Sequence, residues 1–487
     1  MRPFREYAFA EGFTRWPSPR KSRAQRDAAT LLPVREVGPC GVIMTIFMDQ
    51  HTVPRPTSGA SAGELVAQLR EARHRTRRLT EDLSSAELMG PYLEIVNPVL
   101  WEIGHVAWFH EYWTLRHAAG HVPLIERGDR LWDSSNVAHK TRWHLDLPDR
   151  AGTYGYMADV LARQEERLGH GIDDEARYFH DLSIRHEDMH VEALTYMRQT
   201  LAYAPPADLC DSAPPPAGAL PGDVAVPGGT WRLGSTAAEG FVFDNEKWAH
   251  EVALAPFRIA RAAVTNAEFV AFIDAGGYRT REFWSEAGWA WREKHNAERP
   301  VYWQPRRDGV WTVRRYRAVE ELAPHAPVVF VSWFEAEAWC RWAKRRLPTE
   351  GEWEAAAIGE PTAEGTALAD RRRPWPWGDA APDGNRANLD FTFDRPADVA
   401  AFAAGDSAFG CRQMIGNVWE WTASDFLPFA GFSADPYRDY SQPWFGTRKV
   451  LRGGGWATSA RIARPAYRNF FTPDRNDVFA GFRTCAA

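Results

Sequence analysis

The stretch Arg346-Leu-Pro-Thr-Glu-Gly-Glu-Trp-Glu354 has the composition that decides the fold of the second half of the chain. Its tryptophan brings a large apolar surface, its glycine permits a tight turn, and its acidic side chains can accept hydrogen bonds in loops. Short apolar runs around it, such as Val450–Leu451, are separated by Gly, Pro, Asp and Asn. The pattern predicts two helices, Trp333–Arg345 and Glu350–Ile358. We therefore expect an α+β domain with much irregular structure over residues 224–487.

The pattern changes on the N-terminal side of this domain. Residues 204–223 are rich in proline, which ends helices and favours an extended linker. Before the linker, over residues 59–203, apolar residues recur at helical spacing, and we expect four helices that pack as a bundle. These helices are an amphipathic segment through Leu65, Leu69, Leu79 and Leu83, then residues 98–117, 154–168 and 174–202. The predicted fold class is α+β multidomain, with a four-helix bundle before an α+β domain.

The N-terminal residues 1–58 are expected to be a disordered extension of the bundle. Residues 1–43 are rich in Arg, Pro and small residues, a composition that is typical of an organelle transit peptide. Four acidic residues in this stretch argue against a transit peptide. A start of translation at Met44 or Met48 is the alternative.

Composition excludes several classes of protein. The chain has 487 residues and a net charge of −6, which argues against a basic nucleic-acid-binding surface. No apolar run approaches the ~18–20 residues of a membrane-spanning helix, so we expect a soluble protein with no membrane partner. The five cysteines are scattered and include no CxxC pair, which excludes a disulfide framework and favours a cytoplasmic location. Composition does not indicate the oligomeric state.

A pair of histidines marks the last predicted helix of the bundle, in His186-Glu-Asp-Met-His190. Residues at i and i+4 lie on one face of a helix, so both imidazoles can reach a single ion. A third ligand is needed, and His105 in Trp101-Glu-Ile-Gly-His-Val-Ala-Trp-Phe109 lies on another predicted helix. Imidazole is a ligand for iron, zinc, copper or nickel, so the spacing predicts a metal site and leaves the metal open.

Spacing alone leaves three alternatives to this site. The paired histidines can be ordinary surface or core residues. The third ligand can be another of the 15 histidines, among them His110, His117, His144 and His180. The same five residues also match the HExxH pattern of zinc hydrolases, in which Glu187 would be the catalytic base.

An ordered series of motifs resembles the formylglycine-generating-enzyme (sulfatase-modifying-factor) fold over residues 224–485. The series comprises Val226–Ser235, Ala263–Phe269, Pro327–Trp333, Arg346–Glu354, Trp375–Asp379, Gly416–Trp421 and Leu451–Trp456. This fold also serves as a C-type-lectin-like binding module, so it does not define an activity. The formylglycine-generating enzyme holds copper with paired cysteines near its C-terminus. Here only Cys485 lies there and Cys411 is far off, so we do not expect that activity.

A DinB-like bundle with three histidines, fused to this fold, resembles the ergothioneine sulfoxide synthase family EgtB and its relatives. The resemblance implies an enzyme that joins a chalcogen to the imidazole C2 of hercynine (trimethylhistidine), with Fe(II) as cofactor and O2 as co-substrate. The family's ligand elements match His105, His186 and His190. Its Y-x-x-Y element matches Tyr437 as the catalytic proton or electron donor and Tyr440 as a pocket wall. We therefore expect the active site at the seam between the two domains.

Three departures from the family concern the substrates. Met189 replaces a glutamine that helps to hold hercynine. The Arg-x-x-Arg pair that clamps the donor γ-glutamylcysteine is missing, and Lys140 and Arg142 are the only nearby cations. Phe470 and Phe471 replace a Trp-Asp pair, so an acid that meets the amine of the donor is gone.

A neutral donor follows from these losses, because a site without a guanidinium pair and an acid should bind a dipeptide poorly. The chain is similar to the branch that contains selenoneine synthase, SenA, which uses a selenosugar and forms a C–Se bond. A sulfoxide synthase that uses γ-glutamylcysteine or cysteine is the alternative, and a non-catalytic lectin-like module is the alternative of another class. The quaternary ammonium of hercynine suits a cage of aromatic rings, with Tyr440, Trp444, Phe470 and Phe471 as candidates.

Overall fold

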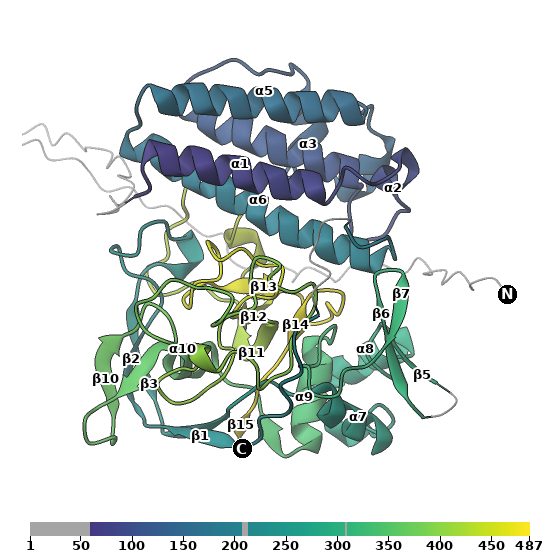
Figure 1. The fold of residues 1–487 in the computed structure, drawn as a ribbon, viewed down its shortest axis with the longest axis vertical. Helices are drawn as coiled ribbons and strands as arrows, with labels where there is room; N and C mark the ends of the chain where they lie inside the picture. Colours follow the sequence, from purple (N-terminus) through teal and green to yellow (C-terminus); the bar gives the residue numbers. More distant parts are fainter. Residues whose placement is uncertain (1–58, 207–212, 307–308) are drawn as a thin grey trace, which may run out of the picture. The chain divides into compact units, whose positions relative to one another are not determined.

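Four helices form a bundle in the computed structural model, which describes residues 59–206, 213–306 and 309–487 (Figure 1). They are α1 (Ala62–Arg78), α3 (Val99–His110), α5 (Arg150–Gly169) and α6 (Asp174–Thr200). A π-helical segment, Glu111–His117, continues α3, and the short helices α2 (Ser85–Met89) and α4 (Gly128–Trp132) lie in the connections. The predicted extension over residues 1–58, with its alternatives, lies outside the described residues.

Helix α1 is shorter than its apolar spacing predicts. The prediction of one helix through Leu83 is wrong, because α1 ends at Arg78 and a capping box of Ser84 and Glu87 begins α2. Leu79 and Leu83 are nevertheless buried in the core. Their spacing therefore reflects burial in the connection between two helices and not a continued helical face.

Two four-stranded sheets carry the second domain (Figure 1). The first has the order β1 (Asp223–Val226), β4 (Phe257–Ala260), β15 (Cys485–Ala486) and β8 (Arg345–Arg346). The second has the order β13 (Asn469–Phe471), β12 (Lys449–Arg452), β11 (Trp419–Asp425) and β14 (Ala480–Gly481). Smaller sheets pair β2 (Gly229–Leu233) with β3 (His250–Leu254), β9 (Gly359–Pro361) with β10 (Leu368–Arg372), and β6 (Trp311–Arg315) with β5 (Trp303–Pro305) and β7 (Ala318–Glu321).

The helices of this domain complete the α+β architecture. They are α7 (Asn266–Asp274), α8 (Glu286–His295), α9 (Trp333–Trp342) and α10 (Glu350–Ile358). The prediction for α10 is confirmed, whereas the predicted Trp333–Arg345 helix ends at Trp342. Among the described residues, no helix combines the length and the apolar character that crossing a membrane requires.

The sequence motifs of the second domain bond to one another in its core. Trp353 of α10 is fully buried and donates to Glu420 of β11 at 2.7 Å. Glu354 pairs with Arg452 of β12, and neither side chain is exposed. Gly453 has a φ of 99°, a left-handed conformation that favours glycine. These buried polar groups are satisfied only when the motifs meet, which explains why motifs far apart in sequence specify one fold.

Helix α6 connects the bundle to the second domain. It packs against α1 and α3 within the bundle (Figure 1). Toward the second domain, its Glu192 accepts a hydrogen bond from Trp419 Nε1 at 2.6 Å, and its Asp188 pairs with Arg461 at 2.8 Å. Both carboxylates are buried, so α6 belongs to the cores of both parts.

Candidate metal centre

Three histidines from two helices of the bundle converge on one point. His105 lies on α3, and His186 and His190 lie one turn apart on α6. One ring nitrogen of each lies within 4.8 Å of the others, and the Nε2 atoms of His186 and His190 are 3.3 Å apart. In the part of the chain that the structure describes, no other cluster of His, Cys, Asp or Glu has this spacing. The structure thus brings the three predicted ligands together.

Polar contacts orient two of the three rings. His105 Nδ1 donates to the backbone carbonyl of Trp132 at 2.8 Å, and His190 Nδ1 lies 2.6 Å from a carboxylate oxygen of Glu102. A histidine whose Nδ1 carries the proton presents the lone pair of Nε2, and such partners are typical around protein-bound metals. Burial favours the protonated form of Glu102, but its interactions with His190, His105 and Asn97 lower its pKa to about 2, so it is a carboxylate.

Burial keeps the imidazoles of His105 and His186 neutral. Burial, followed by repulsion from His190, lowers the pKa of His105 to about 3. The same causes hold the pKa of His186 well below its ordinary value, and its ring stacks on Phe109 with 3.5 Å between centroids. A neutral imidazole keeps the lone pair that a metal needs, so this donor set fits a divalent transition metal such as Fe(II).

The other candidate histidines face elsewhere. His117 and His144 are exposed. His110 is buried and pairs with Glu187 at 3.0 Å, while His180 Nδ1 bonds to the backbone of its own helix. None of the four joins the triad.

Glu187 does not face the three histidines. Its carboxylate is fully buried against α1, where it accepts hydrogen bonds from Arg73 at 3.0 Å and from Thr76 at 2.7 Å. A general base must reach the water that it activates. The geometry therefore gives no support to an HExxH hydrolase mechanism with Glu187 as its base.

Glutamine at Glu187 is expected to destabilise the protein without releasing a metal. The change leaves the buried guanidinium of Arg73 without its charge partner, which costs about 3–5 kcal/mol in the free energy of unfolding. Denaturant unfolding and metal analysis of Glu187→Gln measure both effects, with Glu175→Gln, exposed on the same helix, as the control. Unchanged stability combined with lost activity would instead support a catalytic Glu187.

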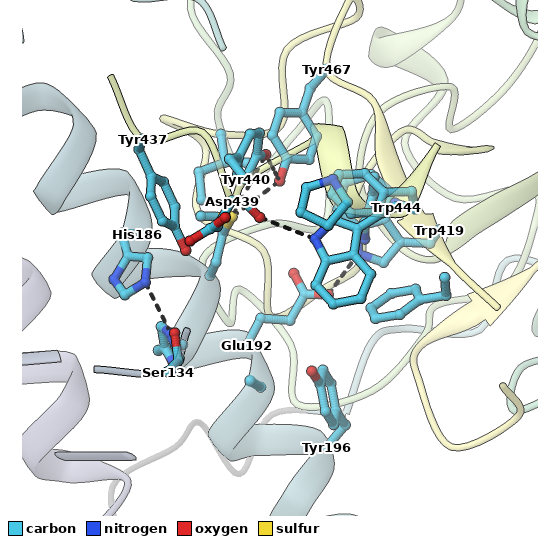
Figure 2. Close-up of a pocket in the computed structure, with 18 of the residues that line it drawn as sticks. Ser134, His186, Glu192, Tyr196, Trp419, Tyr437, Asp439, Tyr440, Trp444 and Tyr467 are labelled. Carbon is cyan, nitrogen blue, oxygen red and sulfur yellow. Dashed lines mark hydrogen bonds between the residues drawn. The ribbon is translucent and has the colours of Figure 1, made fainter. Parts of the chain in front are cut away.

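His186 and His190 of the triad line a cavity of about 630 Å³ between the bundle and the second domain (Figure 2). His186, Met189, His190 and Glu192 of α6 form one wall. The second domain contributes an aromatic wall of Trp419, Tyr437, Tyr440, Trp444, Tyr467, Phe470 and Phe471. The cavity lies at the seam where we expect the active site.

Tyr437 points toward His186 from the aromatic wall (Figure 2), with 6.2 Å between the two ring centroids. Burial, with the carboxylates of Asp439 and Asp133 nearby, raises the pKa of this phenol above its ordinary value. The phenol therefore stays protonated at neutral pH and can deliver a proton to a reacting group.

Tyr440 and Met189 meet at the cavity wall. The Tyr440 hydroxyl donates to the Tyr467 hydroxyl at 3.2 Å, which in turn lies 3.3 Å from the Met189 sulfur. The Tyr440 ring stacks on Phe243 with 4.4 Å between centroids. Because its hydroxyl already has protein partners, Tyr440 suits a wall position better than the role of a proton donor.

Of the two predicted cations, only Arg142 lines the cavity. Lys140 is exposed and does not contribute to the wall, so the structure does not bring it to the site. The Arg142 guanidinium is buried and donates to Asn97 Oδ1 at 2.8 Å and to the Val137 carbonyl at 3.0 Å. Its hydrogen-bonding groups are therefore engaged within the protein.

Several of the cavity residues are not predicted by any sequence pattern, namely Ser134, Ser135, Glu192, Trp419, Asp439, Tyr467 and Asn469. Glu192 is notable, because its buried carboxylate accepts hydrogen bonds from Trp419 at 2.6 Å and from Thr458 at 2.5 Å. Its position two residues after His190 is a sequence signal from which a place near the site could have been predicted. Trp419 belongs to the motif Gly416–Trp421, whose tryptophans the sequence explains by burial alone.

The described cysteines do not suit the copper chemistry of formylglycine-generating enzymes. Cys340, Cys411 and Cys485 are all free and buried. Burial raises the pKa of Cys411 to about 11 and that of Cys485 to about 12. Among the described residues, no group of three or more side chains that could hold a metal ion includes a cysteine.

Two family models match the chain in succession. The model described as the DinB superfamily matches residues 68–197, and that of the sulfatase-modifying factor enzyme 1-like domain matches residues 211–487. The predicted fold class, a DinB-like bundle before a formylglycine-generating-enzyme-like domain, is confirmed.

Curated relatives match the chain over nearly their whole length. A hercynine oxygenase from Mycolicibacterium thermoresistibile is 41% identical over 86% of this chain and 94% of its own. A hercynine oxygenase from Mycolicibacterium smegmatis is 39% identical over 86% of this chain and 97% of its own. A formylglycine-generating enzyme from Streptomyces coelicolor is 34% identical over 59% of this chain and 96% of its own.

Proposed function

This chain belongs to the EgtB-like family of hercynine oxygenases, and we propose that it is an Fe(II)- and O2-dependent enzyme that acts on hercynine. In this proposal it forms a C–Se bond at the imidazole C2 of hercynine with a selenosugar as donor, as the resemblance to selenoneine synthase implies. The observation that carries the proposal is the triad of His105, His186 and His190, of which His186 and His190 line a cavity whose facing wall holds Tyr437.

The residues of the cavity have distinct parts in this reaction. The three histidines would hold the iron, which when bound would supply redox chemistry with O2. Replacing the C2–H bond of hercynine and the Se–H bond of the donor by one C–Se bond releases two protons and two electrons, for which O2 is the acceptor. Tyr437 faces the triad as a protonated phenol and is placed to deliver a proton there.

The aromatic wall supports hercynine as the substrate. The trimethylammonium group has no N–H to donate, and it binds by electrostatic attraction to the faces of aromatic rings. Tyr440, Trp444, Phe470 and Phe471 all line the cavity, next to Met189 on the facing wall. A cage of rings beside the histidines would hold the cation and direct the imidazole toward the metal.

The charges of the cavity favour a neutral donor. A γ-glutamylcysteine carboxylate is recognised best by a free, forked guanidinium. Arg142 is the one Lys or Arg side chain among the described residues that line the cavity, and its donors already bond to Asn97 and Val137. A sugar, which needs hydroxyl partners and no counter-charge, is the better fit.

Anaerobically reconstituted enzyme is expected to form a selenium-containing product from hercynine, O2 and a selenosugar, and little product from γ-glutamylcysteine or cysteine. Mass spectrometry of the products separates the donors. Efficient formation of a sulfoxide from γ-glutamylcysteine, with no product from the selenosugar, would support the sulfoxide synthase alternative. A folded protein that binds no metal and turns over no donor would support the lectin-like module.

A further inference from the structure

Arg142 lines the same cavity as His186 and His190 of the triad. It belongs to the 3-10 helix His139–His144, and it is buried although it lines the cavity. Its guanidinium donates to Asn97 Oδ1 at 2.8 Å and to the Val137 carbonyl at 3.0 Å. Because these hydrogen bonds go to protein groups and not to the cavity, the guanidinium can fix the orientation of those protein groups.

One chain of polar contacts leads from Arg142 to His190. The Asn97 side chain accepts from Arg142 through Oδ1 and donates through Nδ2 to Glu102 Oε1 at 2.5 Å. The other oxygen of Glu102 lies 2.6 Å from His190 Nδ1. Because Asn97 uses both ends of its amide, Arg142 sets the orientation of that amide, and the amide holds the carboxylate that orients the ring of His190.

A second path leads from Arg142 to His105 through an indole. The guanidinium lies over the Trp101 ring at 3.8 Å from its centroid. The same indole stacks on the His105 ring, with 4.9 Å between centroids and 7° between planes. Trp101 Nε1 is anchored to the Leu131 carbonyl at 2.7 Å. The plane of His105 therefore depends on an indole that Arg142 helps to fix.

We infer that Arg142 is a positioning residue of the metal centre, which orients His190 through Asn97 and Glu102 and His105 through Trp101. This role differs from donor binding, and it rests on the proposed function only for the presence of the metal. Partners that orient metal ligands typically change metal affinity by about 10–100-fold when they are mutated. A residue of the cavity wall thereby helps to orient the histidines of the metal centre.

Co(II) affinity and the visible spectrum of the Co(II)-loaded protein test this role without any assay of turnover. Arg142→Gln and Asn97→Ala are each expected to weaken Co(II) binding by about 10–100-fold and to change the spectrum, because the ligands lose their orientation. The double variant should bind no more weakly than Arg142→Gln alone, since both changes break the same path. Lys140→Gln, an exposed cation two residues away, is the matched control and should leave both readouts unchanged.

Arg142→Lys keeps the charge but not the fork, so it should restore only part of the affinity. A merely structural role of Arg142 as a tether of the Ser134–Val137 loop would lower the melting temperature of the metal-free protein and leave Co(II) affinity and spectrum as in the wild type. That result, or additive losses in the double variant, would overturn the role of Arg142 and leave the proposed function intact. A folded wild-type protein that binds neither Co(II) nor Fe(II) would overturn the proposed function as well.

Discussion

Alanine at His186 or at His190 is expected to abolish iron binding and all O2-dependent activity. Each change removes one of the three imidazoles that converge within 4.8 Å of one another, and the two that remain would be too few protein ligands to hold the ion. The loss of metal affinity should exceed the about 10–100-fold that is typical when a partner of a ligand is removed. Elemental analysis after anaerobic reconstitution, together with O2 consumption, measures both losses.

His180→Ala is the matched control for these variants. His180 is buried on the same helix, and its Nδ1 bonds to the backbone carbonyl of Ala176, outside the triad. The variant should keep its iron at the wild-type stoichiometry. Iron retained by His186→Ala but lost from His180→Ala would show that the metal is held by a different set of histidines.

Phenylalanine at Tyr437 is expected to lower kcat by about 10²–10⁴-fold, the range that is typical for loss of a positioned proton donor. The substitution removes only the hydroxyl of a side chain that points toward His186, so the shape of the cavity is kept. Iron content and the KM for hercynine should stay close to the wild-type values. Steady-state kinetics at saturating hercynine and donor, with iron measured on the same samples, test this prediction.

Tyr440→Phe separates a specific role of Tyr437 from a general effect of removing a cavity hydroxyl. The Tyr440 hydroxyl is already bonded to Tyr467 and lies beside Met189, so its loss should loosen the wall and raise the KM more than it lowers kcat. Equal losses of kcat in the two variants would contradict the assignment of Tyr437 as the proton donor.

Local sequence patterns predicted the elements that carry the site better than the site itself. The spacing of His186 and His190 places both imidazoles on one face of α6, because that geometry belongs to the helix alone. The helix α10 begins and ends as its pattern indicates. The error at α1 arose where Leu79 and Leu83 are buried by tertiary packing outside a helix, which periodicity cannot distinguish from a continued helical face.

The roles of charged residues near the histidines were beyond any local pattern. Glu187 matches the position of a catalytic base in sequence, yet it turns toward Arg73 on α1, because residues that are adjacent on a helix point about 100° apart. Arg142 and Lys140 are equivalent as nearby cations in sequence, but one is buried over Trp101 and the other is exposed. The partners of a long side chain depend on the surfaces that pack around it, and these surfaces form only in the folded protein.

By itself, the sequence determined a helical bundle before an α+β domain, a pair of histidines on one helical face and, through its ordered motifs, the family. These features depend on contacts within a few residues or on motifs that can be recognised singly. Spacing alone left the third ligand open, and the tertiary structure shows that His105 lies with His186 and His190, that Tyr437 faces them from the second domain, and that the buried Arg142 bonds to Asn97. Residues that are far apart in the chain meet because burial of apolar surface brings the helices and sheets together, and no local spacing encodes that packing.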